Sequence, residues 1–314
     1  MKILLYYFSG TGNTKLCASF LKEHFRKLNN EVVAVEITSE LNIIDPSLYD
    51  VVGFGYPIHA FNPPEIFVKY IKKLPKLKEK KKMFFFKVSG EPFSFNNSSS
   101  YKSYRILKKK GFELINEKHF LMPYNIMFKY PDGLQKQMYL YLSPLCKAYA
   151  MDIVEGKDRK VKYHLPSKII SFILRIEWLA PKINSLFFHS KKDLCTKCNK
   201  CINNCPMNAL YINKKGVIKS TSQCALCMRC SLNCPVNAIH MGILNPWVVN
   251  GGFHYKELSE NTSIKGDYVN YNTKGYFKNF RKYYLAQNKY LESHGIEIPV
   301  DYYKEDLLEL LDRK

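Results

Sequence analysis

The chain lacks long hydrophobic runs. No window of about 18 residues is apolar and uncharged, whereas a membrane-spanning helix needs about 20 such residues. The first residues already show the apolar and aromatic pattern of a strand, so we expect no cleavable leader. The sequence therefore predicts a protein without a transmembrane segment.

Acidic residues are scarce. The 27 Asp and Glu residues face 48 Lys and Arg residues, which gives a formal net charge of +21. Such a charge can indicate binding to nucleic acid or to an anionic membrane. No nucleic-acid-binding motif accompanies the lysines, so we expect no nucleic-acid partner. The basic surface favours acidic protein partners instead.

Cysteines are concentrated in two runs, each with the spacing C-x2-C-x2-C-x3-C-P. When Cys195 is aligned with Cys224, the runs agree at 8 of 16 positions. Paired C-x2-C sequences can bind zinc, but a zinc site does not require eight cysteines in this arrangement. Without a leader, a disulfide framework is disfavoured. The spacing predicts iron–sulfur clusters in a reducing cytoplasm, typical of an anaerobe. The eight cysteines are Cys195, Cys198, Cys201, Cys205, Cys224, Cys227, Cys230 and Cys234.

These runs resemble the two-cluster bacterial-type ferredoxin, over residues 190–242. The resemblance implies two [4Fe-4S] clusters and a small α+β domain that carries electrons. It also implies that the fourth cysteine of each run binds the cluster of the other run. One cluster is then held by Cys195, Cys198, Cys201 and Cys234, and the other by Cys224, Cys227, Cys230 and Cys205.

Residues 1–160 alternate between strand and helix patterns. Apolar runs predict strands at 2–7, 31–37, 50–56, 82–88 and near 119–122. A first helical pattern follows the loop after the first strand and ends at residue 28. Further helical patterns cover 65–74, 101–110 and 134–155. This alternation predicts an α/β domain with a parallel five-stranded sheet that is covered on both faces.

The loop after the first strand has an unusual composition. It lacks the third glycine of the dinucleotide-binding fingerprint, because Lys15 stands there, and it lacks the Gly-Lys-Ser/Thr of a P-loop. It offers hydroxyls and glycines at a helix N-terminus, which suits a phosphate, although an ordinary helix cap is the alternative. The loop resembles the S/T-x-T-G-N-T phosphate loop of flavodoxins, here Ser9, Gly10, Thr11, Gly12, Asn13 and Thr14.

Resemblance to flavodoxin implies a doubly wound sheet of order 2-1-3-4-5 that binds FMN at the carboxyl ends of its strands. The flavin ring would lie between the loops at 56–64 and 89–100. The first loop offers Tyr56, Pro57, Ile58, His59, Ala60 and Phe61. The second offers Ser89, Gly90, Glu91 and Phe93, with Phe95 as a further aromatic. The alternative is that His59, Phe93 and Phe95 are ordinary loop and packing residues.

Two further segments flank the cluster domain. Residues 161–189 form a connector, in which an amphipathic helix over 167–178 is ended by Pro181. Its apolar face either lies on a membrane surface or packs between the domains, and we favour packing. Residues 243–314 form a Tyr-rich tail with helical spacing at 276–291 and a short acidic helix at 307–311. We expect the tail to cover the sheet or the cluster domain.

Together, the motifs resemble a flavodoxin–ferredoxin fusion. The resemblance predicts an electron-transfer protein that passes electrons between two [4Fe-4S] clusters and a bound FMN and exchanges them with redox partner proteins. The alternative is an FMN-dependent oxidoreductase that reduces a quinone or nitro compound, with His59 as the nearby proton donor. No catalytic residue is otherwise indicated, and no nicotinamide fingerprint is present.

Overall fold

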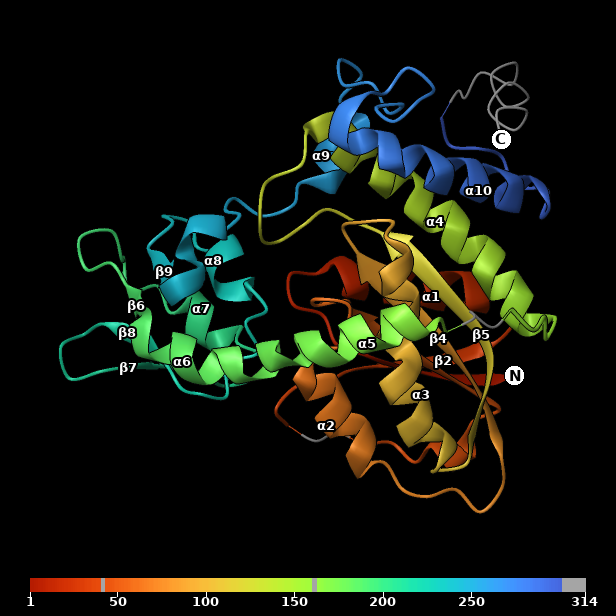
Figure 1. The fold of residues 1–314 in the computed structure, drawn as a ribbon, viewed down its shortest axis with the longest axis horizontal. Helices are drawn as coiled ribbons and strands as arrows, with labels where there is room; N and C mark the ends of the chain where they lie inside the picture. Colours follow the sequence, from red (N-terminus) through yellow and green to blue (C-terminus); the bar gives the residue numbers. More distant parts are fainter. Residues whose placement is uncertain (41–42, 160–162, 301–314) are drawn as a thin grey trace.

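The computed structural model describes residues 1–40, 43–159 and 163–300. Its N-terminal half is a parallel sheet that lies between two layers of helices (Figure 1). The strand order is β2-β1-β3-β4-β5, which confirms the predicted flavodoxin-like topology. The strands are β1 (Lys2–Tyr7), β2 (Glu31–Glu36), β3 (Val51–Pro57), β4 (Lys81–Ser89) and β5 (Phe112–Leu121).

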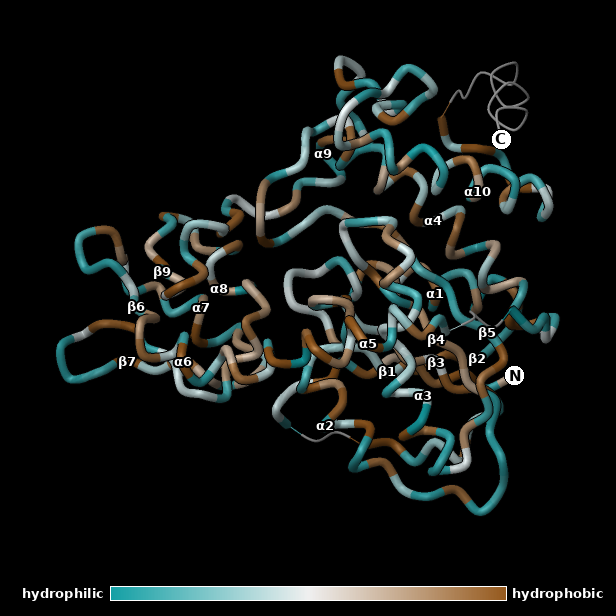
Figure 2. Tube along the Cα trace, in the orientation of Figure 1, coloured by the Kyte–Doolittle hydropathy of each residue, from teal (hydrophilic) through white to brown (hydrophobic). Residues whose placement is uncertain are grey.

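Both faces of the sheet are buried, because each central strand is apolar at nearly every position (Figure 2). Along β1, Ile3 and Leu5 pack on one side, whereas Leu4 and Tyr6 pack on the other. The first side is covered by α1 (Asn13–Lys27) and α4 (Asp132–Val154). The second is covered by α2 (Glu65–Lys73) and α3 (Tyr101–Lys108). The core therefore forms two layers around the sheet.

The fifth strand begins earlier than the sequence predicts. It starts at Phe112, just after Gly111, whose φ of +96° turns the chain out of α3. Charged and polar side chains alternate with apolar ones along its first half, since β5 is an edge strand. The apolar run at its end is therefore only the last part of the strand.

The cysteine runs form a separate small unit with two antiparallel strand pairs. Strand β6 (Phe188–Ser190) pairs with β9 (Ile239–Met241), and β7 (Leu210–Ile212) pairs with β8 (Ile218–Ser220). The two repeats also have the same local backbone conformation. Left-handed φ values recur at three equivalent pairs of non-glycine positions, namely Lys197 and Leu226, Asn199 and Met228, and Asn208 and Asn237. Each run then enters a short helix, α7 (Lys200–Asn203) or α8 (Arg229–Leu232).

The connector is one continuous helical segment that runs from the sheet domain to the cluster unit (Figure 1). It consists of α5 (Leu165–Ile173), the 3-10 turn η3 (Leu174–Leu179) and α6 (Ala180–Phe187). Pro181 does not end the helix, because it lies in the first turn of α6, where its missing N–H is not needed. The predicted packing of the apolar face holds only in part, because Trp178 packs against the core on the α2 side, whereas Ile169 and Ile173 are exposed.

The C-terminal segment covers the outer side of α4 (Figure 1). It contains a 3-10 turn η4 (Gly242–Trp247), the helix α9 (Tyr255–Glu260), a second turn η5 (Gly275–Asn279) and the helix α10 (Phe280–Glu292). The hydroxyl of Tyr290 donates to Asp152 at 2.6 Å, and that of Tyr141 donates to Asn288 at 2.7 Å. The predicted acidic helix at 307–311 lies outside the described residues. Among those described, no helix is both long and apolar enough to cross a membrane.

Candidate flavin and iron–sulfur sites

A cavity of about 420 Å³ opens at the carboxyl edge of the sheet. The loops after β1, β3, β4 and β5 form its walls, because the ends of parallel strands meet at one edge. All the residues predicted to bind the flavin line this cavity except Gly12 and Tyr56. The structure thus brings together Ser9, Gly10, Thr11, Asn13, Thr14, Pro57, Ile58, His59, Ala60, Phe61, Ser89, Gly90, Glu91 and Phe93.

The first loop has the geometry of an anion site. Gly12 precedes α1 with a φ of +107°, a conformation that favours glycine. The hydroxyl of Ser9 accepts hydrogen bonds from the backbone N–H groups of Gly12 and Lys15, each at 3.2 Å. The Thr14 hydroxyl is buried and has no hydrogen-bond partner. An unpaired hydroxyl beside the N-terminus of a 15-residue helix fits an FMN phosphate.

Aromatic and polar side chains form the rest of the cavity. The rings of Phe61 and Phe93 meet edge to face, 6.5 Å between centroids. Ala60 and Phe61 both have positive φ, and such backbone strain in a non-glycine residue is common at ligand sites. Burial raises the pKa of Glu91 to about 6 and lowers the pKa of His59 to about 4, so His59 is neutral near pH 7. The enclosed cavity therefore fits a flat and mostly apolar ring.

Tyr56 is predicted to stack on the flavin, but the structure places it in the core. Its ring is fully buried and packs against Phe67 at a centroid distance of 4.7 Å. Its hydroxyl lies 3.4 Å from that of Ser99. The alternation of a strand explains the difference, because Tyr56 points to the α2 and α3 side. The prediction for Tyr56 is therefore wrong.

The loop after β5 is a further wall of the cavity that the sequence motifs did not indicate. Its residues 122–127 line the site beside the two predicted loops. A Cβ on Gly90 would lie 2.5 Å from the Tyr124 ring, so the two loops touch. The amide of Asn125 donates to the Thr11 hydroxyl at 3.3 Å. The predicted parallel sheet could have indicated this wall, because β5 ends at the same edge as the other parallel strands.

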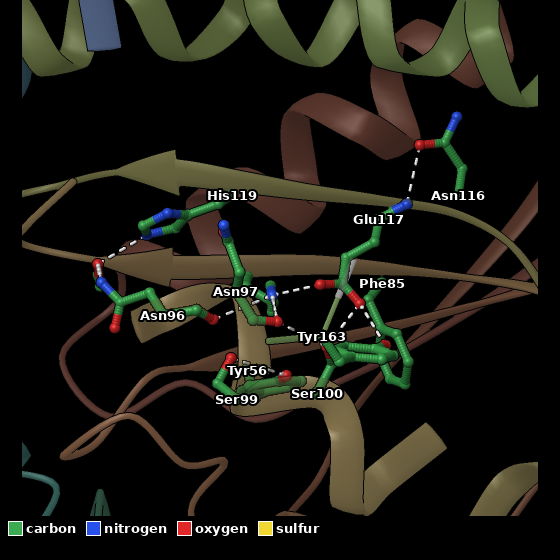
Figure 3. Close-up of polar contacts among 12 residues, drawn as sticks. Tyr56, Phe85, Asn96, Asn97, Ser99, Ser100, Asn116, Glu117, His119 and Tyr163 are labelled. Carbon is green, nitrogen blue, oxygen red and sulfur yellow. Dashed lines mark hydrogen bonds and ion pairs between the residues drawn. The ribbon is translucent and has the colours of Figure 1, made fainter. Parts of the chain in front are cut away.

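A buried ion pair between β4 and β5 holds the loop after β4. Figure 3 shows its Glu117 together with Asn96, Asn97 and Ser100 of that loop. Lys87 and Glu117 are almost completely buried and form a direct ion pair. The Lys87 ammonium also donates to the backbone carbonyls of Asn96 and Asn97. The Ser100 hydroxyl donates to the other oxygen of Glu117. Burial lowers the pKa of Lys87, because it disfavours the charged form. The Glu117 carboxylate and the carbonyls of Asn96 and Asn97 stabilise the ammonium against this effect.

Cysteines from both runs line one small cavity in the cluster unit. Cys195, Cys198 and Cys201 of the first run meet Cys234 of the second. Backbone N–H groups also point at sulfur, with Ala238 donating to Cys234 at 3.2 Å and Ala209 donating to Cys205 at 3.4 Å. Within the described ranges, no three Cys, His, Asp or Glu side chains converge as ligands of a single metal ion.

The cysteines of the second run are more deeply buried. Burial, together with the neighbouring Cys227 and Cys205 thiols, raises the pKa of the Cys224 thiol to about 12. Burial also raises the pKa of Cys227 and Cys230, and Cys205 adds to both. Such thiols become thiolates only beside strong positive charge, which cluster iron supplies. The donor set therefore fits a cluster.

The second cysteine run lies directly against the phosphate loop. Cys227 is 8% exposed and packs in the core of the sheet domain. A Cβ on Gly10 would lie 2.6 Å from the Cys227 carbonyl oxygen, so only glycine allows this approach. Arg229 donates to the backbone carbonyls of Ser9 at 2.6 Å and Gly10 at 2.7 Å. Leu226 completes the wall of the flavin cavity.

Two parts of the chain match known families. Residues 4–118 match the model of the flavodoxin domain, and residues 194–238 match that of the 4Fe-4S dicluster domain. The two matches confirm the resemblance to a flavodoxin–ferredoxin fusion. A search of curated proteins found no match.

Several solved structures are similar to part of the chain. Oxidised flavodoxin 1 from Bacillus cereus is 14% identical, with a TM-score of 0.37, over 49% of this chain and 98% of that one. A flavodoxin from the Archaea is 15% identical, with a TM-score of 0.35, over 49% and 97%. A putative quinone reductase from Klebsiella pneumoniae is 15% identical, with a TM-score of 0.37, over 54% and 93%.

Proposed function

We propose that this flavodoxin–ferredoxin fusion is an electron-transfer protein that exchanges electrons with redox partner proteins through two [4Fe-4S] clusters and one FMN. Its two domains support a redox function. When bound, a cluster carries one electron per step, FMN carries one or two, and the protein holds and tunes both. Free cysteines that serve as cluster ligands are kept reduced in a reducing compartment, so we propose the cytoplasm.

We assign the cofactor ligands as follows. The phosphate of FMN binds the loop from Ser9 to Thr14, at the N-terminus of α1. The ring lies between the loops after β3, β4 and β5. One cluster binds Cys195, Cys198, Cys201 and Cys234, and the other binds Cys224, Cys227, Cys230 and Cys205.

The contact between Cys227 and the phosphate loop carries this proposal. It places the second cysteine run beside the flavin cavity, with Leu226 in the shared wall. The first run lies toward the surface, where Cys198 is exposed. The order is then solvent, first run, second run and flavin cavity, which suits electrons that enter or leave one at a time through the first run.

The surface around the first run favours an acidic partner. Between residues 190 and 220 the chain has seven lysines and a single acidic residue, Asp193. Six of these lysines are exposed, and opposite charges steer the encounter of redox proteins at moderate salt. The lysines are Lys191, Lys192, Lys197, Lys200, Lys214, Lys215 and Lys219.

The first test is the cofactor content of protein purified without oxygen. We expect one FMN, about eight irons and about eight sulfides per chain, because two cubane clusters contain that many. Absorbance with chemical analysis of flavin, iron and sulfide measures these numbers. Eight irons without flavin, even after FMN is added, would remove the flavodoxin half of the proposal. About four irons would remove one cluster.

A second cavity favours a second candidate function, reduction of a small quinone or nitro compound. This cavity, of about 450 Å³, shares His59, Glu177 and Leu226 with the flavin cavity and is also lined by Cys224. Trp178 forms part of its wall, and the indole N–H is buried without a partner. That N–H is suited to a carbonyl or nitro oxygen, because buried donors are normally paired.

Reduction of a quinone to a hydroquinone takes two electrons from the reduced cofactors and two protons. His59, the predicted donor, holds little proton at pH 7, because its pKa is about 4. Burial raises the pKa of Glu177 to about 8, and its Oε1 atom is buried without a hydrogen bond. Glu177 therefore supplies one proton in this proposal, solvent supplies the second, and water reprotonates the carboxylate.

We expect Glu177→Gln to remove a pH dependence of stability. The pKa of Glu177 is raised in the folded state, so its contribution is complete below about pH 4.5 and is lost as the pH rises through 8. Relative to the variant, the native protein should lose about 3 kcal/mol of unfolding free energy between pH 5 and 8.5. Urea denaturation of both proteins across this range measures the difference.

Quinone reduction provides the second readout. The rate of the native protein should fall above about pH 8, whereas Glu177→Gln should be at least about tenfold slower below pH 8 and should lack this fall. His59→Asn serves as the control in the same cavity and should keep the native pH profile. An identical profile for native protein and Glu177→Gln would eliminate Glu177 as the proton donor. Glu91, Lys69 and Lys182 also line the two cavities, and all three are retained in both variants.

A further inference from the structure

The connector has an exposed apolar face along its whole length. Nine large apolar side chains on α5, η3 and α6 are between 49% and 74% exposed. Large apolar patches of this kind on a soluble domain mark an interaction surface. We call them the outer apolar face: Leu165, Ile169, Phe172, Ile173, Ile176, Leu179, Ile183, Leu186 and Phe187.

The opposite side of the same segment is polar and faces the protein. Ser171 is buried and exchanges hydrogen bonds with Asn62, its hydroxyl donating and its carbonyl accepting, both at 2.8 Å. The Arg175 guanidinium also donates to Asn62, at 3.1 Å. Ser167 and Asn184 are buried as well. The segment therefore docks through these polar groups and Trp178, which leaves most of its large apolar side chains outside.

Positive charge borders the outer apolar face. Lys168, Arg175 and Lys182 recur at a heptad spacing along one edge of the helix. Lys168 lies over the Tyr101 ring and Arg175 donates to Asn62, whereas Lys182 is exposed. The single acidic residue of the segment is Glu177, which lines the two cavities. The chain as a whole carries a formal charge of +21. An apolar row with a basic border complements an apolar surface that carries negative charge.

We propose that the outer apolar face lies in the headgroup region of an anionic lipid membrane. The segment from Leu165 to Phe187 is a projecting row about 35 Å long, which suits a helix lying in the plane of a bilayer. Phe, Ile and Leu side chains enter the acyl boundary, while the exposed Lys182 at the edge of the face meets lipid phosphates. The two redox domains remain in the aqueous phase beside the membrane. This proposal does not depend on the proposed function.

The test is sedimentation of the whole protein with lipid vesicles. Neutral vesicles of phosphatidylcholine are compared with vesicles in which about a third of the lipid is phosphatidylglycerol. We expect binding to the anionic vesicles that is at least about tenfold stronger and that weakens at high salt. The variant Phe172→Ser, Ile176→Ser and Leu186→Ser should lose binding at least about tenfold.

The matched control replaces three exposed apolar side chains elsewhere: Leu48, Ile212 and Tyr271, each to serine. It should bind as the native protein does, and circular dichroism and iron content should be unchanged in both variants. Equal binding of native protein and face variant would show adsorption through lysines alone and overturn the proposal. A second result would also overturn it: the native protein binds no vesicles and forms a dimer, and the face variant is a monomer. The face would then join two copies of the chain.

Discussion

Replacing Cys205 and Cys224 together with alanine should remove one cluster and leave about four irons per chain. Replacing Cys205 and Cys195 together should remove both clusters and leave almost no iron. The two double variants carry the same number of lost ligands. They differ only in whether the lost ligands belong to one cluster or to two.

The reason is that, in the proposed assignment, each cluster takes its fourth ligand from the other run. Cys195, Cys198 and Cys201 line a cavity with Cys234, not with Cys205. Cys205 instead lies near Cys224, Cys227 and Cys230, where it contributes to the raised pKa of their thiols. A cubane that loses one of four thiolates is held too weakly to persist through purification.

Iron and sulfide analysis on anaerobically purified variants measures the outcome, and electron paramagnetic resonance after reduction counts the remaining clusters. Cys17→Ala is the control, because Cys17 is buried in the sheet domain, and it should retain all eight irons. The reverse result, four irons in the Cys205 and Cys195 variant, would show that each run holds its own cluster.

Arg229→Met should uncouple the cluster unit from the phosphate loop. Arg229 donates to the carbonyls of Ser9, Gly10 and Asn204 and pairs with Glu36 at 2.6 Å. Its loss leaves these acceptors unpaired in a half-buried junction, which costs about 3 kcal/mol of unfolding free energy. Electrons supplied at the clusters should also reach the flavin at least about tenfold more slowly, because small displacements reduce rates strongly.

The repeat supplies a matched control, because Lys200 stands in the first run at the position equivalent to Arg229 in the second. Lys200 is exposed, and Lys200→Met should change neither the unfolding free energy nor the transfer rate appreciably. Stopped-flow absorbance of the flavin after mixing with a reductant measures the rate, and urea denaturation measures stability. A native transfer rate in Arg229→Met would mean that this junction does not position the two redox sites.

Local patterns made the alternating strands and helices and the cysteine runs predictable, and the resemblance to flavodoxin supplied the sheet order. Strand runs and C-x2-C-x2-C-x3-C-P are defined within a few residues of one another. Tyr56 could not be placed, since the face that a side chain takes near the end of a strand depends on register. Glu177 and His59 are far apart in the sequence, so only tertiary structure brings them to one cavity.

The buried side of the connector helix was likewise not predictable from local sequence. Its helical period was readable, but a periodic apolar face does not say what covers it. Asn62 is distant in the sequence and forms hydrogen bonds with Ser171. These bonds determine that the Ser171 side of the helix faces the protein. The prediction was therefore right for the helix, whereas its apolar face is buried only at Trp178 and is exposed at Ile169 and Ile173.

Because Gly10 lies close to Cys227, flavin binding and docking of the two domains are thermodynamically coupled. Leu226 belongs to the cluster unit but walls the flavin cavity, so a flavin in that cavity favours the docked arrangement. Thermodynamic reciprocity then requires docking to tighten flavin binding by the same factor. The dissociation constant of FMN therefore reports, without any redox measurement, how firmly the two halves of the chain hold each other.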